Sequence, residues 1–432
     1  MLPDILSSRL RVDLQTCNES HGWIARGLAR RFAHFHALSW TPGARPMESS
    51  ILAMRRREVI NNVAEVVISI TSDGAPSLSV QPGSSGGGFE LKRDSMVATL
   101  RAALQQHWQA LGELVLPSTN VSLFFHFFDD ARILWPSNAS SLPREVRLPT
   151  FAVCETASTS EVAVPDYSFH HYHKIRAING SGWPHVLSVI EREARLTPWQ
   201  QRSPSLFWRG AMRSSPLRMH LIPKLRQEGG IRALPNGGIP AQSNRSNLLA
   251  TIDVADTGST AKLSSRYVTL DQQCKHKYLL YLPGNANSIS FKYKLACGSL
   301  VVAVRSRYRE FYHDALLEGK HYTTVAYSAS ADRTVHELRE TLQRLTGRRG
   351  DARAQQMGAN AQTFVREQLS PAALSCFWLM TLTHYVSLYV SDRDRSHARA
   401  LREMLHVTPE RTTLSLRAFP RLRRFWETQR QT

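Results

Sequence analysis

The sequence predicts an α/β fold with two domains, and three observations lead to this class. The chain has 432 residues, enough for two domains of ordinary size that each bury a core. A hydrophobic content of 42%, with 16 Phe, 12 Tyr and 9 Trp, is typical of a globular protein and excludes an intrinsically disordered one. Strand-like runs rich in β-branched residues alternate with segments of helical spacing in both halves of the chain.

The first predicted domain, residues 1–183, combines helices and strands. Residues 10–60 show a helical pattern, and a strand rich in β-branched residues is predicted at 63–71. Large apolar residues at helical spacing predict a helix at 95–111, and the apolar run at 121–128 predicts a buried strand. This order of elements predicts one α/β domain.

The second predicted domain covers residues 184–370. Residues 229–265 are polar and rich in Gly, Pro, Asn and Ser, so they are predicted as a connection. A last apolar helix at 371–390 is predicted to pack back on the first domain. The remaining predicted elements are helices at 184–195, 216–227, 308–317, 330–346 and 351–368, and strands at 206–208, 278–282, 300–304 and 322–326.

The segment after the strand at 278–282 has the pattern of an anion site. The strand turns at Pro283-Gly284 into a polar loop, Asn285 to Ser288, and a basic segment follows. A helix that opens behind an Asn/Ser cap directs several backbone N–H groups at one point, which suits a phosphate. Lys292 and Lys294 would add positive charge. Ordinary αβ connections share this pattern, so the residues alone leave both interpretations open.

A pair of acidic residues, Asp129 and Asp130, follows the strand predicted at 121–128. Proteins of the α/β class place functional side chains at the carboxyl ends of their strands. A carboxylate there can act as a general base. On the residues alone, a turn-forming Asp pair is the simpler explanation.

The net charge of +19 implies attraction to anions. Nucleic acid, an anionic membrane surface and phosphorylated small molecules all qualify. The charge is spread along the chain, and no known nucleic-acid-binding motif occurs. A basic nucleic-acid-binding protein therefore remains an alternative that rests on charge alone.

No metal site is predicted. The five cysteines form no C-x-x-C pair, which excludes the usual zinc and thioredoxin-like patterns. His170, His171 and His173 are neighbours whose side chains point in different directions. Asp392-Arg393-Asp394 imitates a D-x-D metal motif, but it lies in a charged segment after an apolar helix, where a solvated terminus is the simpler explanation.

The targeting signals disagree with one another. The start of the chain lacks the apolar core of a signal peptide, no apolar run reaches the ~18 residues of a membrane helix, and no KDEL occurs. Five N-x-[ST] sequons nevertheless indicate secretory exposure, at Asn18, Asn120, Asn138, Asn179 and Asn244. A missing N-terminal segment would reconcile the two observations, and membrane association would be possible only through that segment.

Over roughly residues 95–390 the chain resembles glycosyltransferase family 90, which includes the Rumi-type protein O-glucosyltransferases and the fungal capsule-associated proteins. The residues that carry the resemblance are Cys274-Lys275-His276-Lys277-Tyr278-Leu279, Gly284-Asn285-Ala286-Asn287-Ser288, Phe291-Lys292, Cys297-Gly298-Ser299-Leu300-Val301 and Phe207-Trp208-Arg209-Gly210.

The resemblance implies a GT-B-like fold with two Rossmann-like domains facing a cleft. Residues 1–183 would form the acceptor side, with the helices of 371–432 packed on it, and residues 184–370 would bind the donor. The implied reaction is an inverting, metal-independent transfer from a UDP-sugar, UDP-glucose or UDP-xylose, to a hydroxyl of a protein or glycan acceptor. It needs no cofactor and no nucleic acid, and it implies the lumen of the endoplasmic reticulum or Golgi.

The resemblance also implies roles for particular residues. Asp130 aligns with the family's catalytic Asp, and Asp129 fills a neighbouring position. The implied donor contacts are Arg209, Arg218, Asn285, Ala286, Asn287, Ser288, Ile289, Ser290 and Lys292, because arginine forks and free N–H groups suit a diphosphate. Ser290 replaces an arginine of the family. A family member that binds a UDP-sugar without transferring it is therefore a further alternative.

The cysteines carry a second implication of the resemblance. Cys274 and Cys297 match a pair that the family joins by a disulfide. A separate hypothesis, which the resemblance does not supply, joins Cys17 and Cys376 near opposite ends of the chain and leaves Cys154 unpaired. Five buried thiols in a cytosolic protein are the alternative.

Overall fold

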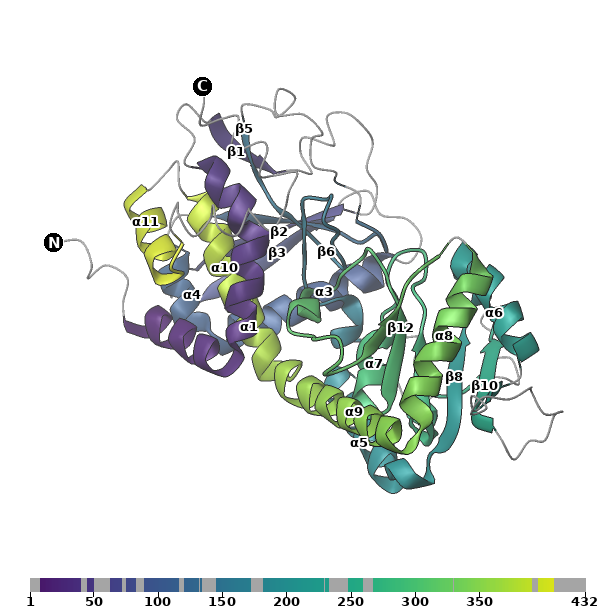
Figure 1. Ribbon diagram of the computed structural model, residues 1–432. Helices are drawn as coiled ribbons and strands as arrows, with labels where there is room; N and C mark the ends of the chain where they lie inside the picture. Colours follow the sequence, from purple (N-terminus) through teal and green to yellow (C-terminus); the bar gives the residue numbers. More distant parts are fainter. Residues whose placement is uncertain are drawn as a thin grey trace, which may run out of the picture. The chain divides into compact units, whose positions relative to one another are not determined.

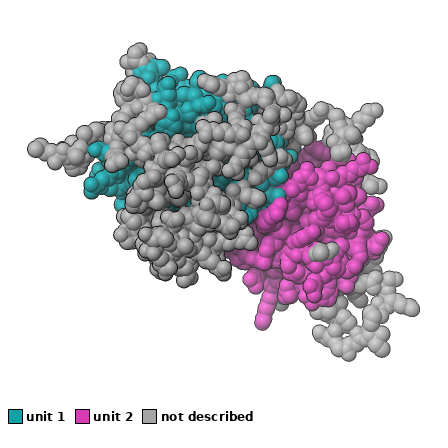
Figure 2. Space-filling model, turned by 90° about the horizontal axis from the view of Figure 1, so that it is seen from above, with its two compact units in different colours: residues 1–170, 308–315, 371–432 teal, residues 171–307, 316–370 magenta. Residues whose placement is uncertain are grey.

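The structure is a computed structural model of the whole chain (Figure 1). It describes residues 8–39, 45–49, 63–71, 75–82, 89–115, 120–131, 133, 145–171, 182–228, 230–232, 248–258, 267–328, 330–390 and 395–407. Two compact units divide the chain (Figure 2). Unit 1 is Met1–His170, Tyr308–Ala315 and Pro371–Thr432, and unit 2 is His171–Arg307 and Leu316–Ser370. Each contains a sheet and helices, which confirms the α/β class, while the domain limits at 183 and 370 stay predictions.

Unit 1 contains a five-stranded sheet in the order β3-β2-β4-β6-β7. The strands β4, β6 and β7 are parallel, whereas β2 is antiparallel to both β3 and β4. The carboxyl ends of the three parallel strands therefore meet at one edge. The strands are β2 (Val63–Ile70), β3 (Pro76–Pro82), β4 (Val121–His126), β6 (Thr150–Ala152) and β7 (Glu161–Ala163); β1 (Arg45–Ser49) and β5 (Glu145–Leu148) form a separate parallel pair.

The helix α10 (Pro371–Tyr389) packs on the helices of unit 1, as predicted (Figure 1). It is buried on all sides from Ala373 to Leu388, which suits a helix that is apolar all round. Tyr385 donates its hydroxyl to the Ser122 carbonyl at 2.7 Å. The other α-helices in the described part of unit 1 are α1 (Ser8–Ser39), α3 (Phe89–Gln106), α4 (Trp108–Leu114) and α11 (Arg395–Met404).

Unit 2 contains a six-stranded sheet in the order β13-β12-β11-β8-β10-β9, parallel except for β9. Alternate residues of β8, β11 and β12 pack against α6 and α8, and β12 is buried throughout, as in a parallel sheet covered on both faces. The strands are β8 (Ser203–Gly210), β9 (Gly230–Arg232), β10 (Leu248–Asp256), β11 (His276–Tyr281), β12 (Leu300–Val304) and β13 (Thr323–Val325). The helices are α5 (Trp183–Leu196), α6 (Pro216–Glu228), α7 (Ser290–Ala296), α8 (Ala331–Thr346) and α9 (Arg348–Gln368).

Both predicted disulfides are present. Cys274 and Cys297 have Cα atoms 4.9 Å apart in unit 2, and Cys17 and Cys376 have Cα atoms 5.3 Å apart in unit 1. Cys154 is free and buried. The first bridge encloses β11 and α7, so it ties the two ends of the predicted anion-site segment together.

Four predictions of secondary structure are wrong. Residues 45–49 are the strand β1 and not a helix, because they pair with β5. The helix predicted at 308–317 is only a short 3-10 turn, Phe311–Asp314, because Arg309 pairs with Glu155 in an antiparallel bridge that keeps the preceding chain extended. The helix predicted at 95–111 breaks at His107, where α3 ends and α4 begins.

The fourth error is in the segment 229–265, which was predicted as a polar connection. It contains β9 and the nine-residue strand β10, which pairs with β8 inside the sheet. The sequence from Leu248 to Ala255 alternates apolar and polar residues only in part, and its strand conformation is stabilised by pairing with β8 and β9.

Candidate active site

The sheet of unit 2 has a topological switch point between β8 and β11. Counted along the chain, its parallel strands lie in the order second, first, third, fourth, fifth. The chain leaves β8 to one side and returns to form β11 on the other side. In open α/β sheets ligands bind beyond the carboxyl ends of the two strands at such a point. Here these ends carry Arg209-Gly210 and the loop from Leu282 to Ser290.

Arg218 on α6 joins the two loops of the switch point. Its Nη1 donates to the Ala211 carbonyl at 3.1 Å and to the Ser214 hydroxyl at 2.7 Å, and its Nη2 donates to the Leu282 carbonyl at 2.7 Å. Burial lowers the pKa of the guanidinium to about 10, so it stays charged at neutral pH. Arg218, a predicted donor contact, therefore also links the loop after β8 to the loop after β11 through hydrogen bonds.

The loop after β11 is held by its own backbone. The Gly284 N–H donates to the Asn287 carbonyl at 3.3 Å, and a Cβ on Gly284 would lie 3.2 Å from that oxygen, which explains the glycine. The Ser288 N–H donates to the Tyr281 hydroxyl at 3.0 Å. Ala286 is buried and Asn285 is exposed at the tip.

The predicted Asn/Ser cap of α7 is wrong. Ile289 is the N-cap residue of α7, and it makes no side-chain capping bond. Ser288 and Ser290 instead share a hydrogen bond between their hydroxyls at 2.9 Å. Because the two hydroxyls bond to each other, neither side chain caps the helix.

Two lysines of α7 point inward. Lys292 is fully buried, with its Nζ 3.4 Å from the Ile289 carbonyl and over the Tyr293 ring at 4.9 Å. Lys294 donates to Gln273 Oε1 at 3.1 Å, and burial together with the charge of Arg218 lowers its pKa to about 7. The Lys292 amino group thus lies against the backbone of Ile289 at the start of α7, whereas that of Lys294 lies at Gln273, before β11 begins. Direct contact of Lys292 with a donor stays a prediction.

Arg209 is oriented by a residue that the sequence did not predict. Its guanidinium pairs with the Asp253 carboxylate of β10 at 2.7 Å and stacks 4.4 Å from the centre of the Phe207 ring. Residue 210 is a glycine because a Cβ at this position would lie 2.7 Å from the Trp208 ring. Asp253 was missed because the strand β10 was missed.

In unit 1, Asp129 and Asp130 follow β4 as predicted, at the edge where β4, β6 and β7 end. The Asp129 carboxylate is 58% exposed and pairs with Lys92 Nζ at 2.7 Å. Lys92 also lies 5.1 Å from the centre of the Tyr167 ring. Asp130 is half-buried. The two carboxylates therefore differ in exposure, and the choice of Asp130 as the base stays a prediction.

Buried groups hold the backbone of Asp129 and that of Ile133. The Cys154 thiol donates to the Asp129 carbonyl at 3.4 Å, and burial raises the thiol's pKa, so it keeps its proton. The Glu161 carboxylate accepts from the Ile133 N–H at 2.7 Å and lies 3.1 Å from His126 Nε2 at the end of β4. No local sequence pattern predicts this arrangement, because Glu161 lies 28 residues from Ile133.

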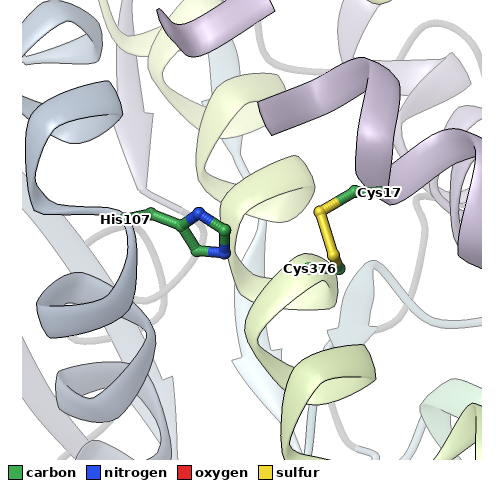
Figure 3. A group of neighbouring side chains, drawn as sticks. All are labelled: Cys17, His107 and Cys376. Carbon is green, nitrogen blue, oxygen red and sulfur yellow. A yellow bond between two sulfur atoms is a disulfide. The ribbon is translucent and has the colours of Figure 1, made fainter. Parts of the chain in front are cut away.

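Among the described residues, one group of side chains brings potential metal ligands together (Figure 3). Cys17, His107 and Cys376 place a ligand atom each within 4.8 Å of one another. The two sulfurs are bonded to each other, so neither is a thiolate. His107 Nδ1 lies 2.8 Å from the Asp13 carboxylate. This group is a disulfide with a buried histidine beside it, and it does not fit a metal ion.

Known proteins match most of this chain. The sequence profile of Glycosyl transferase family 90 matches residues 113–415, so the chain belongs to that family of α/β glycosyltransferases. Human Protein O-glucosyltransferase 1 is 26% identical over 267 residues, 60% of this chain and 63% of that protein. The O-glucosyltransferase rumi of Drosophila melanogaster is 25% identical over 244 residues, 56% of this chain and 55% of that protein.

The rumi of Drosophila pseudoobscura pseudoobscura is 23% identical over 305 residues, 69% of this chain and 66% of that protein. The chain thus spans between about half and two thirds of the length of these curated relatives. In the described part of the chain, none of the helices is long and apolar enough to cross a membrane.

Proposed function

We propose that this protein transfers a sugar from a UDP-sugar, glucose or xylose, to a hydroxyl of a protein or glycan acceptor, with inversion at the anomeric carbon and without a metal ion. The observation that carries the proposal is the switch point. The family's donor motifs, Phe207 to Gly210 and Gly284 to Ser288, emerge from the two strands that define it. Arg218 bonds the loops that follow both strands.

In the proposed reaction Asp130 takes the proton of the acceptor hydroxyl. The hydroxyl oxygen then attacks the anomeric carbon from the face opposite the UDP, and the bond between that carbon and the diphosphate oxygen breaks. Negative charge develops on the diphosphate. Arg209, Arg218, the buried Lys292 and N–H groups of the loop from Asn285 to Ser290 would stabilise this charge.

We place the reaction in the lumen of the secretory pathway. The disulfides Cys17–Cys376 and Cys274–Cys297 are typical of an oxidising compartment, and the sequons agree with it. Membership of the family favours this function over a nucleic-acid-binding role, which rests on charge alone. A family member that binds the donor without transferring the sugar remains the second candidate because of Ser290.

A screen of UDP-sugars tests the proposal. The purified protein should release UDP from UDP-glucose or UDP-xylose, faster when a protein or glycan acceptor is present, and EDTA should leave the rate unchanged. A rate that collapses in EDTA and recovers with Mn²⁺ would contradict the metal-independent mechanism. UDP binding with no turnover of any donor would establish the second candidate.

Restoring the family's arginine should strengthen donor binding. Ser290 begins α7 and is half-buried next to Ser288. A charge-assisted contact contributes about 1.5–3 kcal/mol, so Ser290→Arg should tighten UDP by about tenfold or more in a calorimetric titration. Ser290→Gln is the matched control, since it adds length without charge and should leave the affinity unchanged. An unchanged affinity in Ser290→Arg would show that position 290 does not face the diphosphate.

A further inference from the structure

A sequon of unit 1 lies beside a hollow in the surface. Asn18, Glu19 and Ser20 form the motif on α1, and all three are exposed. Asn18 lines a hollow of about 510 Å³ between α1, α10 and α11. Leu14, Met380, Met404 and Leu405 are among its apolar residues, and Arg11, Gln15 and Glu403 are among its polar residues.

We propose that Asn18 is N-glycosylated and that the first sugar of the glycan lies in this hollow. The proposal rests on the secretory location included in the proposed function. The amide nitrogen of Asn18 forms a bond to C1 of an oligosaccharide carried on a lipid diphosphate. The bond between C1 and the diphosphate oxygen breaks, the lipid diphosphate leaves, and the amide loses one proton to a base.

The lining of the hollow suits a pyranose ring. A sugar has apolar C–H faces and a rim of hydroxyls, so it is best held by apolar contact combined with a few polar groups. The hollow offers both, and Asn18 is part of its wall. All lining residues that the structure describes belong to unit 1.

The helix around the sequon is interrupted. His21, directly after Ser20, has non-helical backbone angles, φ −139° and ψ 46°, so α1 is kinked there. Gly22 follows, and an added Cβ on it would lie 3.9 Å from the Asn18 side-chain oxygen, which is ordinary contact. Asn18 therefore lies three residues before the kink in the helix and at the edge of the hollow.

The order of synthesis leaves time for the modification. Cys17, the neighbour of Asn18, is bonded to Cys376, which lies 359 residues later. At ~5–20 residues per second the partner emerges roughly 20–70 s after Cys17. The sequon is thus accessible in the growing chain before the disulfide and α10 fix this segment.

The test compares two substitutions of the same residue in the full chain, secreted from a eukaryotic host behind a secretion leader. Ser20→Thr keeps the sequon and Ser20→Ala removes it, while both leave Asn18 in place. Peptide mapping after release by N-glycosidase should find Asn18 converted to Asp in wild type and Ser20→Thr, but not in Ser20→Ala. An unmodified Asn18 in secreted wild type overturns the proposal.

Thermal unfolding tests the place of the first sugar. Trimming with an endoglycosidase that leaves one sugar on Asn18 should not change the Tm, whereas Ser20→Ala should lower it by about 2–4 °C. Asn120→Gln is the control: Asn120 is exposed before β4 and is not part of the hollow, so the Tm should stay unchanged. Equal Tm values for wild type and Ser20→Ala overturn the placement in the hollow. Turnover of UDP-sugars by unglycosylated protein is a separate readout, so the proposed function can fail independently.

Discussion

Asp130→Asn should abolish sugar transfer and leave the affinity for UDP unchanged. The amide cannot accept the proton of the acceptor hydroxyl, and a positioned general base contributes about 10²–10⁴-fold to a rate. UDP affinity should persist because Asp130 belongs to unit 1, whereas the predicted donor contacts belong to unit 2. The measurements are the transfer rate with a saturating acceptor and a calorimetric titration of UDP.

The control for this variant is Asp129→Asn. Asp129 is exposed and pairs with Lys92, and exposed ion pairs contribute about 0–1 kcal/mol, so the rate should fall less than about fivefold. Full activity in Asp130→Asn together with an inactive Asp129→Asn would reverse the assignment of the base. Neither variant removes the hydrogen bonds of the Cys154 thiol to the Asp129 carbonyl and of the Ile133 N–H to the Glu161 carboxylate.

Arg218→Met should weaken UDP binding by about tenfold or more and destabilise the protein by about 2–4 kcal/mol. The substitution keeps an apolar chain of similar length but removes three donated hydrogen bonds. The carbonyls of Ala211 and Leu282 then lose a charged hydrogen-bond donor, and the bond to Leu282 is buried. Chemical denaturation and UDP titration measure the two effects.

Arg218→Lys distinguishes the effect of the positive charge from the effect of the hydrogen bonds that link the two loops. A lysine keeps the positive charge, but its single ammonium lacks the planar fork that reaches both loops. UDP binding should therefore be weakened in both variants, and the lysine variant should retain more stability. Wild-type affinity in Arg218→Met would show that the link between the loops does not serve donor binding.

The parts of the fold that could be predicted are those determined by the local sequence pattern. Buried apolar runs predicted β4, β11 and β12, and helical spacing predicted α8, α9 and α10 close to their observed limits. The two disulfides followed from the family resemblance and from the cysteines left after it. The strand β10 was missed because its residues give a weak local pattern and its conformation depends on pairing with β8.

In the candidate site too, residues within local motifs could be predicted, whereas contacts between distant segments could not. Asp130, Arg209 and Arg218 were predicted as site residues because each lies in or near a motif at the end of a strand. Asp253, which pairs with Arg209, and Glu161, which accepts from the Ile133 N–H, were not predicted, because these contacts span 44 and 28 residues of sequence. The inward direction of Lys292 was missed as well, since a lysine in a basic segment is usually exposed.

Hydrogen exchange of the backbone amides, with and without UDP, tests the central claim that the switch point of unit 2 is the donor site. We expect slower exchange in two segments, residues 209–214 after β8 and residues 282–290 after β11, because the diphosphate would order both loops. Residues 129–133 of unit 1 should exchange at unchanged rates. If UDP binds and neither loop of the switch point is protected, the donor site lies elsewhere and the account is wrong.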